Sequence, residues 1–197
     1  TMNFLQLLPL SRPRLEVLFE IYAEREDYLR HIAKRLTMNP SLAFSILKKL
    51  HQTGFIMKRK VGKEVQYSLQ QDRASDLLVG LLEEFHLEKA LERSVELKTV
   101  ITLLLNNKLV LSSSQRIYLF GSFALGNFTK ESDIDILFVT AKPKLISRNC
   151  REISAVVGRT ISPLIYTQKK FQQELSAQEP LLSSIVNTVR QRVVIKS

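Results

Sequence analysis

The sequence contains little cysteine and no long apolar segment. Its 197 residues include one cysteine, Cys150, which excludes a disulfide within the chain. The three histidines, His31, His51 and His86, are scattered and form no zinc-type Cys/His pattern. No apolar run approaches the roughly eighteen residues of a transmembrane helix. The N-terminal residues also lack the pattern of a signal peptide. We therefore expect a cytoplasmic protein that does not enter the membrane.

Basic side chains exceed acidic ones along the whole chain. Lys and Arg number 29 against 19 Asp and Glu, which gives a formal net charge of +10. Residues 1–72 hold 12 basic and 7 acidic side chains, and residues 73–197 hold 17 and 12, so each part has an excess of five. Such an excess favours polyanionic partners such as nucleic acids and nucleotides. A basic surface that serves only solubility is the alternative.

The centre of the chain reads as a strand, a turn, a short helix, a polar loop and a second strand. The first strand, Ile117–Phe120, is apolar and ends at Gly121. The second spans Ile134–Val139. Because side chains alternate along a strand, Ile134 and Ile136 are expected on its buried face, and the residues between them on the other.

Two aspartates, Asp133 and Asp135, share that other face of the second strand. Neighbouring carboxylates repel each other unless a cation lies between them, and Mg²⁺ is typically held by one or two carboxylates together with substrate phosphates. Gly121 lets the backbone approach a ligand closely, and Ser122 supplies a hydroxyl. The start of the following helix offers N–H groups to a phosphate. The stretch can therefore hold a magnesium–nucleoside triphosphate.

The combination of Gly121-Ser122, ten intervening residues and Asp133-Ile134-Asp135-Ile136 resembles the signature of the DNA polymerase beta-like nucleotidyltransferase superfamily in its minimal form. The resemblance implies a fold with a mixed sheet flanked by helices. It also implies that Mg²⁺ is bound by Asp133 and Asp135, which would be the catalytic residues, and that the nucleotide is bound by Gly121, Ser122 and Ser132. An ordinary edge turn followed by a solvated strand end is the alternative.

One expected catalytic residue is absent from the sequence. Members of this superfamily usually carry a third carboxylate on the next strand, here Arg159–Tyr166, and its position is occupied by Ser162. A serine hydroxyl is a poor substitute for a charged metal ligand and cannot act as general base near neutral pH. Glu152 and Glu174 are the nearest other acids in sequence, and neither is expected on a strand that faces the aspartates. The sequence thus retains the metal–triphosphate half of the site and lacks part of the catalytic half.

The N-terminal part reads as three short helices followed by a basic hairpin. The helices are predicted over Arg14–Glu26, Leu29–Leu36 and Ser41–Gln52, and the hairpin joins Phe55–Lys60 to Glu64–Leu69 around Gly62. This order, and the run ILKKLHQTGFIMKRKVGKEVQYSL in particular, resembles the winged helix-turn-helix of bacterial and archaeal regulators. The resemblance implies that the third helix enters the major groove of DNA and that the hairpin touches the backbone or the minor groove.

On the third helix, Ala43, Leu47 and Leu50 are expected to face inward. The expected outward residues are Ser41, Leu42, Ser45, Ile46, Lys48 and Lys49. The predicted DNA contacts are Ser41, Ser45, Lys48, Lys49, Lys58, Arg59, Lys60 and Lys63. Leu42, Phe44 and Ile46 make this helix unusually apolar for a DNA reader. They could contact thymine methyls, the second domain or a second copy of the chain, and a winged helix that docks proteins is the alternative.

The predicted architecture is α+β with two domains: a winged helix over 10–72, a helical connection over 73–92 and a nucleotidyltransferase-like domain over 93–197. In the connection, Asp72 or Ser75 is the expected helix cap, and one or two helices are predicted there. The helical spacing of apolar residues continues over Glu88–Asn107. After the aspartates, Lys144–Val157 is predicted as a helix with Lys144, Arg148 and Arg151 on one face. That face could approach phosphate or simply be solvated.

Three functions are compatible with these features. The first is a DNA-binding regulator whose nucleotidyltransferase domain binds Mg²⁺–NTP and is catalytically weak or degenerate. The second is an active enzyme that moves a nucleotidyl group from NTP onto a protein, RNA or small-molecule hydroxyl. The third is an antitoxin-like module that binds a partner protein. A homodimer is expected in the first case, because winged-helix readers commonly pair on two half-sites.

Overall fold

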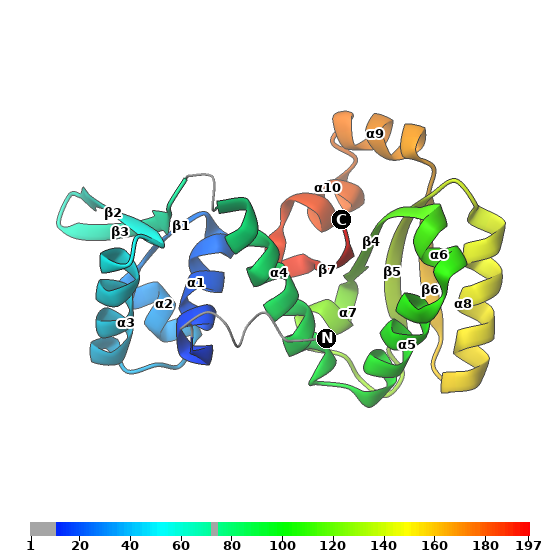
Figure 1. Ribbon diagram of the computed structural model, residues 1–197, viewed down its shortest axis with the longest axis horizontal. Helices are drawn as coiled ribbons and strands as arrows, with labels where there is room; N and C mark the ends of the chain where they lie inside the picture. The colour runs from blue at the N-terminus through cyan, green and yellow to red at the C-terminus, as the bar shows by residue number, and fades with distance from the viewer. Residues whose placement is uncertain (1–10, 72–74) are drawn as a thin grey trace. The chain divides into compact units, whose positions relative to one another are not determined.

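The computed structural model describes residues 11–71 and 75–197 (Figure 1). The chain divides into two compact units after Phe85, and helix α4 (Ser75–Leu91) supplies residues to both. Asp72, one of the two predicted caps, and the predicted boundary at residue 72 lie outside the described residues. Within the part that is described, no helix is both long and apolar enough to cross a bilayer.

Residues 11–71 of the N-terminal unit form three helices and a small antiparallel sheet. Its elements before α4 are α1 (Arg12–Glu24), β1 (Glu26–Tyr28), α2 (Leu29–Arg35), α3 (Pro40–Gln52), β2 (Ile56–Val61) and β3 (Glu64–Leu69). The strand order is β1-β3-β2. The three predicted helices and the hairpin are confirmed. The short strand β1 was not predicted, because three residues are too few to show an alternating pattern; it pairs with Gln66–Ser68 of β3.

Helix α3 has clear start and stop signals. Asn39 caps it by accepting a hydrogen bond from the Ser41 backbone N–H at 2.8 Å, and Pro40 occupies the first turn, where no N–H donor is needed. The helix ends before Gly54, which has a positive φ of 80°. Its inward residues are buried and pack into the core of this unit, which fixes the direction of its outward side.

The C-terminal unit is a four-stranded mixed sheet covered by helices. After α4, its elements are α5 (Val95–Asn106), α6 (Lys108–Ser113), β4 (Ser114–Phe120), α7 (Gly121–Leu125), β5 (Ile134–Thr140), α8 (Pro143–Val157), β6 (Ile161–Tyr166), α9 (Gln168–Ser176), α10 (Pro180–Asn187), the 3-10 helix η2 (Val189–Gln191) and β7 (Val193–Lys196). The strand order is β6-β5-β4-β7. Strands β5 and β6 are parallel, whereas β4 is antiparallel to both of its neighbours. The predicted α+β class with a mixed, helix-flanked sheet is confirmed.

Each face of this sheet has its own core. In β5, Ile134, Ile136 and Phe138 are fully buried in one cluster with residues of α5, α6, α7 and α8. Leu137 and Val139 point to the other face and pack with α9 and α10. Figure 1 shows α5, α6 and α8 along one side of the sheet and α9 and α10 toward the other. Residues 133 and 135 therefore belong to the α9–α10 face, as the alternation predicts.

The single cysteine lies within the first of these cores. Cys150 is on α8 and is 1% exposed. Burial in apolar surroundings disfavours the thiolate and raises the pKa of the thiol to about 12. Cys150 thus packs as a small apolar side chain.

The helical spacing predicted over Glu88–Asn107 is divided between two helices. Helix α4 ends at Leu91, and α5 begins at Val95. Ser94 causes the break, because its hydroxyl accepts a hydrogen bond from the Leu97 backbone N–H at 3.1 Å and caps α5. The apolar spacing runs through both helices, so periodicity alone did not reveal the interruption.

Candidate functional site

The Gly-Ser turn and the aspartate strand meet at one point. Strand β4 ends at Phe120, which lies opposite Asp135 in the antiparallel pairing of β4 with β5. Gly121 then adopts a left-handed φ of 68°. A Cβ atom placed on Gly121 would overlap Oδ2 of Asp135 and lie 3.1 Å from its Cγ. The turn backbone is thus packed directly against the carboxylate, and only glycine fits between them.

Asp133 and Asp135 create an electrostatically unfavourable pair. Asp133 is exposed and Asp135 is partly buried. Burial raises the pKa of Asp135 above its usual value, and the negative charge of Asp133 raises it further. A hydrogen bond with Ser162 acts in the opposite direction on the same pKa. A bound cation would relieve both unfavourable effects.

Ser162 stands beside Asp135 on the neighbouring strand. The parallel pairing of β5 with β6 places Asp135 opposite Ser162, at the position where the sequence analysis expected a third carboxylate. Among residues 11–71 and 75–197, no group of three or more His, Cys, Asp or Glu side chains is arranged to hold a metal ion. The local donors are two carboxylates and a hydroxyl. Two carboxylates fit Mg²⁺ when phosphate oxygens complete its coordination.

The two serines predicted to bind nucleotide have different surroundings. Ser122 directly follows Gly121 in α7, and its backbone carbonyl accepts hydrogen bonds from the N–H groups of Gly126 and Asn127. The hydroxyl of Ser132 accepts a hydrogen bond from the Thr129 backbone N–H at 2.8 Å and lies 3.3 Å from the Thr129 hydroxyl. Ser132 therefore closes the loop that leads into β5. The structure brings Ser122 to the turn and uses Ser132 to shape the loop.

Arg159 is a positioning residue that the sequence analysis missed. Its guanidinium donates to the backbone carbonyls of Thr129, Lys130 and Ser132, which belong to the loop just before Asp133. It also lies 3.4 Å from Glu96 and 5.7 Å from the centre of the Phe123 ring. Because its partners are mainly carbonyls about thirty residues upstream, no side-chain pattern could have revealed this role.

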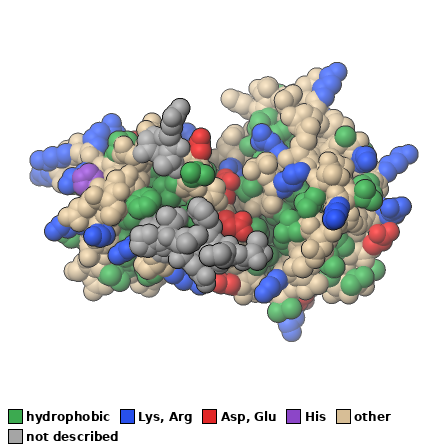
Figure 2. Space-filling model, viewed as in Figure 1, with side chains coloured by type: hydrophobic (Ala, Val, Ile, Leu, Met, Phe, Trp, Pro, Cys, Tyr) green, Lys and Arg blue, Asp and Glu red, His purple; other side chains and the backbone are tan. Residues whose placement is uncertain are grey.

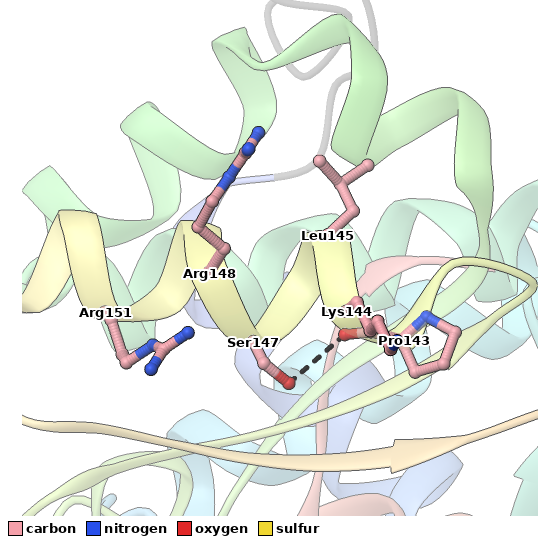
Figure 3. A pocket seen from close by; sticks show the side chains of 6 residues that line it. All are labelled: Pro143, Lys144, Leu145, Ser147, Arg148 and Arg151. Carbon is pink, nitrogen blue, oxygen red and sulfur yellow. Dashed lines mark hydrogen bonds between the residues drawn. The ribbon is translucent and has the colours of Figure 1, made fainter.

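The predicted basic face of α8 lines a separate surface hollow. The hollow has a volume of about 600 Å³ and is lined by Pro143, Lys144, Leu145, Ser147, Arg148 and Arg151 (Figure 3). Arg148 forms an ion pair with Glu152 at 3.5 Å. The inward residues of α8 pack on the sheet face opposite to the two aspartates. The basic face is therefore not part of the aspartate site.

The outward surface of α3 differs from the prediction at one residue. Of the six residues predicted to face outward, five are exposed: Ser41, Leu42, Ser45, Lys48 and Lys49. Phe44 is exposed as well. Ile46 is 7% exposed and packs inward with Ala43, Leu47 and Leu50, so its predicted outward position is wrong. The buried stripe is wider than assumed, because α3 packs against α1, α2 and β2 together.

The cations of the hairpin are not equivalent. Lys58, Lys60 and Lys63 are exposed, and Figure 2 shows Lys and Arg side chains gathered over the β2–β3 end of this unit. Arg59 instead donates a 2.8 Å hydrogen bond to Gln66 and lies 3.7 Å from Glu26. Alternation along β2 also places Arg59 on the opposite side from Lys58 and Lys60. The three lysines of the hairpin are therefore more available to a binding partner than Arg59 is.

A buried ionic cluster supports the N-terminal unit. Arg35 binds the carboxylates of both Glu20 and Asp27, which are only 6% and 3% exposed. Asp27 also lies 3.4 Å from His31 and accepts a hydrogen bond from the Tyr28 backbone N–H at 2.7 Å. This cluster was not predicted from the sequence, because its members come from three elements, α1, β1 and α2. The cluster links α1, β1 and α2, and α3 packs against α1 and α2.

Comparisons with known protein families give a match within each unit. Residues 10–61 match the MarR family, and residues 104–193 match the nucleotidyltransferase domain family. No curated protein matches the sequence.

Solved structures similar to the chain include two bacterial proteins. The transcriptional regulator HlyU from Vibrio vulnificus is 20% identical, with 40% of this chain and 79% of that chain covered and a TM-score of 0.35. YusO from Bacillus subtilis is 17% identical, with 55% and 80% covered and a TM-score of 0.37. The two family matches thus fall on different units, the MarR match on the winged-helix region and the nucleotidyltransferase match on the C-terminal sheet and its helices.

Proposed function

We propose that the protein is a DNA-binding regulator whose nucleotidyltransferase domain binds a magnesium–nucleoside triphosphate and is catalytically weak or degenerate. The observation that carries this proposal is the composition of the site: Asp135 adjoins the Gly121 turn, the charge of Asp133 acts on Asp135, and Ser162 occupies the place beside Asp135. The domain would then serve as a nucleotide sensor for the winged helix.

The electrostatics of the aspartate pair support binding of Mg²⁺–NTP. The pKa of Asp135 is raised by burial and by Asp133, so holding both carboxylates ionised has a cost that a divalent cation would remove. In the proposed complex, Asp133 and Asp135 hold the ion and triphosphate oxygens fill its remaining positions. The Gly121 turn lets the backbone approach the triphosphate, and the hydroxyl of Ser122, the next residue, would contact it.

The same site supports only weak catalysis. Activation of an attacking hydroxyl near neutral pH requires a base, and the hydroxyl of Ser162 cannot take that role. A serine also adds no negative charge for a second metal ion, which two-metal transfer requires. Ser162 instead forms a hydrogen bond with Asp135. The arrangement thus favours retention of the nucleotide over its transfer.

Calorimetric titration tests the nucleotide half of the proposal. ATP, GTP, CTP and UTP are titrated with Mg²⁺ into the wild type, Asp133→Asn and Asp135→Asn. We expect micromolar, Mg²⁺-dependent binding of at least one nucleotide to the wild type. Each substitution should weaken it about tenfold or more, because a charge-assisted contact to the ion is lost. Asparagine preserves the shape of the side chain, so the comparison isolates the charge.

Arg151→Gln is the matched control, since it also removes one charge but lies on the α8 face away from the aspartates. Its affinity for nucleotide should equal that of the wild type. Absence of binding of any nucleotide to the wild type would contradict the proposal. Steady release of pyrophosphate by the wild type would instead show that the protein is an active nucleotidyltransferase.

Exposed cations on the winged helix support the DNA half of the proposal. Lys48 and Lys49 project from α3, and Lys58, Lys60 and Lys63 project from the hairpin. Lysines at such positions contact phosphates and orient the protein on the duplex. Two copies of the chain would engage two half-sites, as is usual for winged-helix readers.

Neutralising the hairpin lysines should weaken DNA binding and reduce its salt dependence. For Lys58→Gln/Lys60→Gln, the slope of log affinity against log salt concentration should fall by close to two, at about 0.9 for each lost phosphate contact. Fluorescence anisotropy with a labelled duplex at several salt concentrations gives the slope. Arg59→Gln should change it less, because Arg59 is engaged by Gln66 and Glu26. Equal slopes for the wild type and the double variant would show that the hairpin lysines do not contact DNA phosphates.

A further inference from the structure

The start of the third helix has an unusual exposed surface. In the first two turns of α3, residues 40–47, Ala43, Ile46 and Leu47 are buried. Leu42 and Phe44 are 50% and 53% exposed, which is high for large apolar side chains. The first turns of a recognition helix are the part that contacts base edges. The apolar side chains thus occupy the positions where sequence is read.

The two apolar residues flank a polar line on the helix. Ser41, Ser45 and Lys48 follow one another at helical spacing along the centre of the exposed side. At about 100° per residue, Leu42 lies on one flank of this line and Phe44 on the other. A groove that received the polar line would therefore meet an apolar side chain at each margin.

The hydrogen-bonding capacity of these two turns is low. Residues 40–47 include no Arg, Lys, Asn or Gln, which are the side chains that recognise guanine or adenine by paired hydrogen bonds. Serine hydroxyls accept or donate to several bases and discriminate little among them. The C5 methyl of thymine is the one apolar group that a base pair presents in the major groove, and side chains such as phenylalanine contact it.

Charge around this surface favours DNA over an apolar protein partner. Lys48 and Lys49 are exposed in the next turn of α3, and the hairpin carries exposed lysines as well. A basic rim attracts the phosphates that border the major groove on both sides. The combination of apolar side chains on both flanks of the polar line and cations around them matches a thymine-containing groove.

We infer that Leu42 and Phe44 are specificity-determining residues that recognise thymine methyl groups in the major groove. The inference rests on the DNA-binding half of the proposed function. It assigns the preferred site to sequences with thymine at the positions that face the two flanks of α3. Lys48 and Lys49 supply affinity that does not depend on sequence.

Replacement of thymine by deoxyuridine tests the inference, because it removes the methyl group and keeps the hydrogen-bonding edge. Preferred duplexes are first selected from a random pool with the full chain, and each thymine is then replaced singly. Affinity of the wild type should fall roughly fourfold for each contacted methyl, the effect of burying one methyl-sized group. Leu42→Ala and Phe44→Ala should each bring the thymine-to-uracil affinity ratio at one position to about one.

Lys49→Gln is the control: it should weaken binding to thymine and uracil duplexes equally and leave their ratio unchanged.

If no duplex is selected and no DNA is bound, the proposed function fails. If DNA is bound but uracil substitution leaves the wild-type affinity unchanged, the inference alone is overturned. If Phe44→Ala changes the sedimentation of the protein while the thymine-to-uracil ratio is kept, Phe44 contacts a second copy, and its assignment to thymine is wrong. The uracil duplexes are measured with wild-type protein, so the test does not depend on the folding of a variant.

Discussion

Replacing Gly121 with alanine is expected to weaken binding of Mg²⁺–nucleoside triphosphate by about a hundredfold, the scale that a displacement of about 1 Å produces in a positioned site. The added Cβ would overlap Oδ2 of Asp135, so the carboxylate or the turn must move. Movement of the carboxylate disturbs the proposed metal ligand, and movement of the turn disturbs the backbone that approaches the triphosphate. One methyl group would therefore damage both halves of the site.

Backbone strain has to be separated from this clash. Gly121 has a φ of 68°, where alanine is strained by roughly 1–2 kcal/mol even in open space. Gly158 provides the matched control, since its φ is 73° and a Cβ there would meet nothing within 4 Å. Thermal unfolding should therefore report strain in both Gly121→Ala and Gly158→Ala. Calorimetric titration should report lost nucleotide binding in Gly121→Ala alone, and an equal loss in both variants would refute the steric explanation.

Replacing Arg35 with methionine is expected to lower the free energy of unfolding by about 3–5 kcal/mol. The guanidinium binds two carboxylates that are nearly inaccessible to water, those of Glu20 and Asp27. Methionine retains an unbranched stem and good helix propensity, so the main change is the loss of the cation. Glu20 and Asp27 would then remain buried and close together without the guanidinium that they share. Keeping buried carboxylates ionised without a cation lowers the free energy of unfolding.

The stability of Arg35→Met is best measured by urea unfolding followed by circular dichroism. Arg30 lies on the same helix, is exposed and offers the control Arg30→Met, for which a change within about 0.5 kcal/mol is expected. DNA affinity measured well below the unfolding midpoint should change little, because Arg35 is not among the proposed contacts. A stability equal to that of the wild type would mean that the cluster contributes nothing net to folding.

Local patterns in the sequence predicted most of the architecture. The alternation around Asp133 and Asp135 was sufficient to place them on one face, because a strand has a period of two and its neighbours Ile134 and Ile136 require burial. The register of Ser162 against Asp135 agrees with the position assigned to it from the motif.

Interactions between distant segments were not predictable in the same way. Arg159 binds carbonyls of a loop about thirty residues away, and carbonyls carry no sequence signal. Arg35 joins acids from two other elements, and the sequence does not say which of its many charges are buried. Ile46 was assigned to the wrong side because the width of a buried stripe depends on how many elements a helix packs against. Such features follow from tertiary packing and appear only with the fold.

The rate at which the buried thiol of Cys150 reacts with a labelling reagent reports how often the core of the C-terminal unit opens. Cys150 is on the core-facing side of α8, and burial raises the pKa of its thiol to about 12. Alkylating and disulfide reagents react with the thiolate, which is scarce at neutral pH and shielded in the native fold. The rate of labelling at this one position therefore measures how often α8 separates from the sheet. Comparing the labelling rate of Cys150 with and without Mg²⁺–nucleotide would show whether the ligand stabilises the whole domain against opening or only the loops around the aspartates.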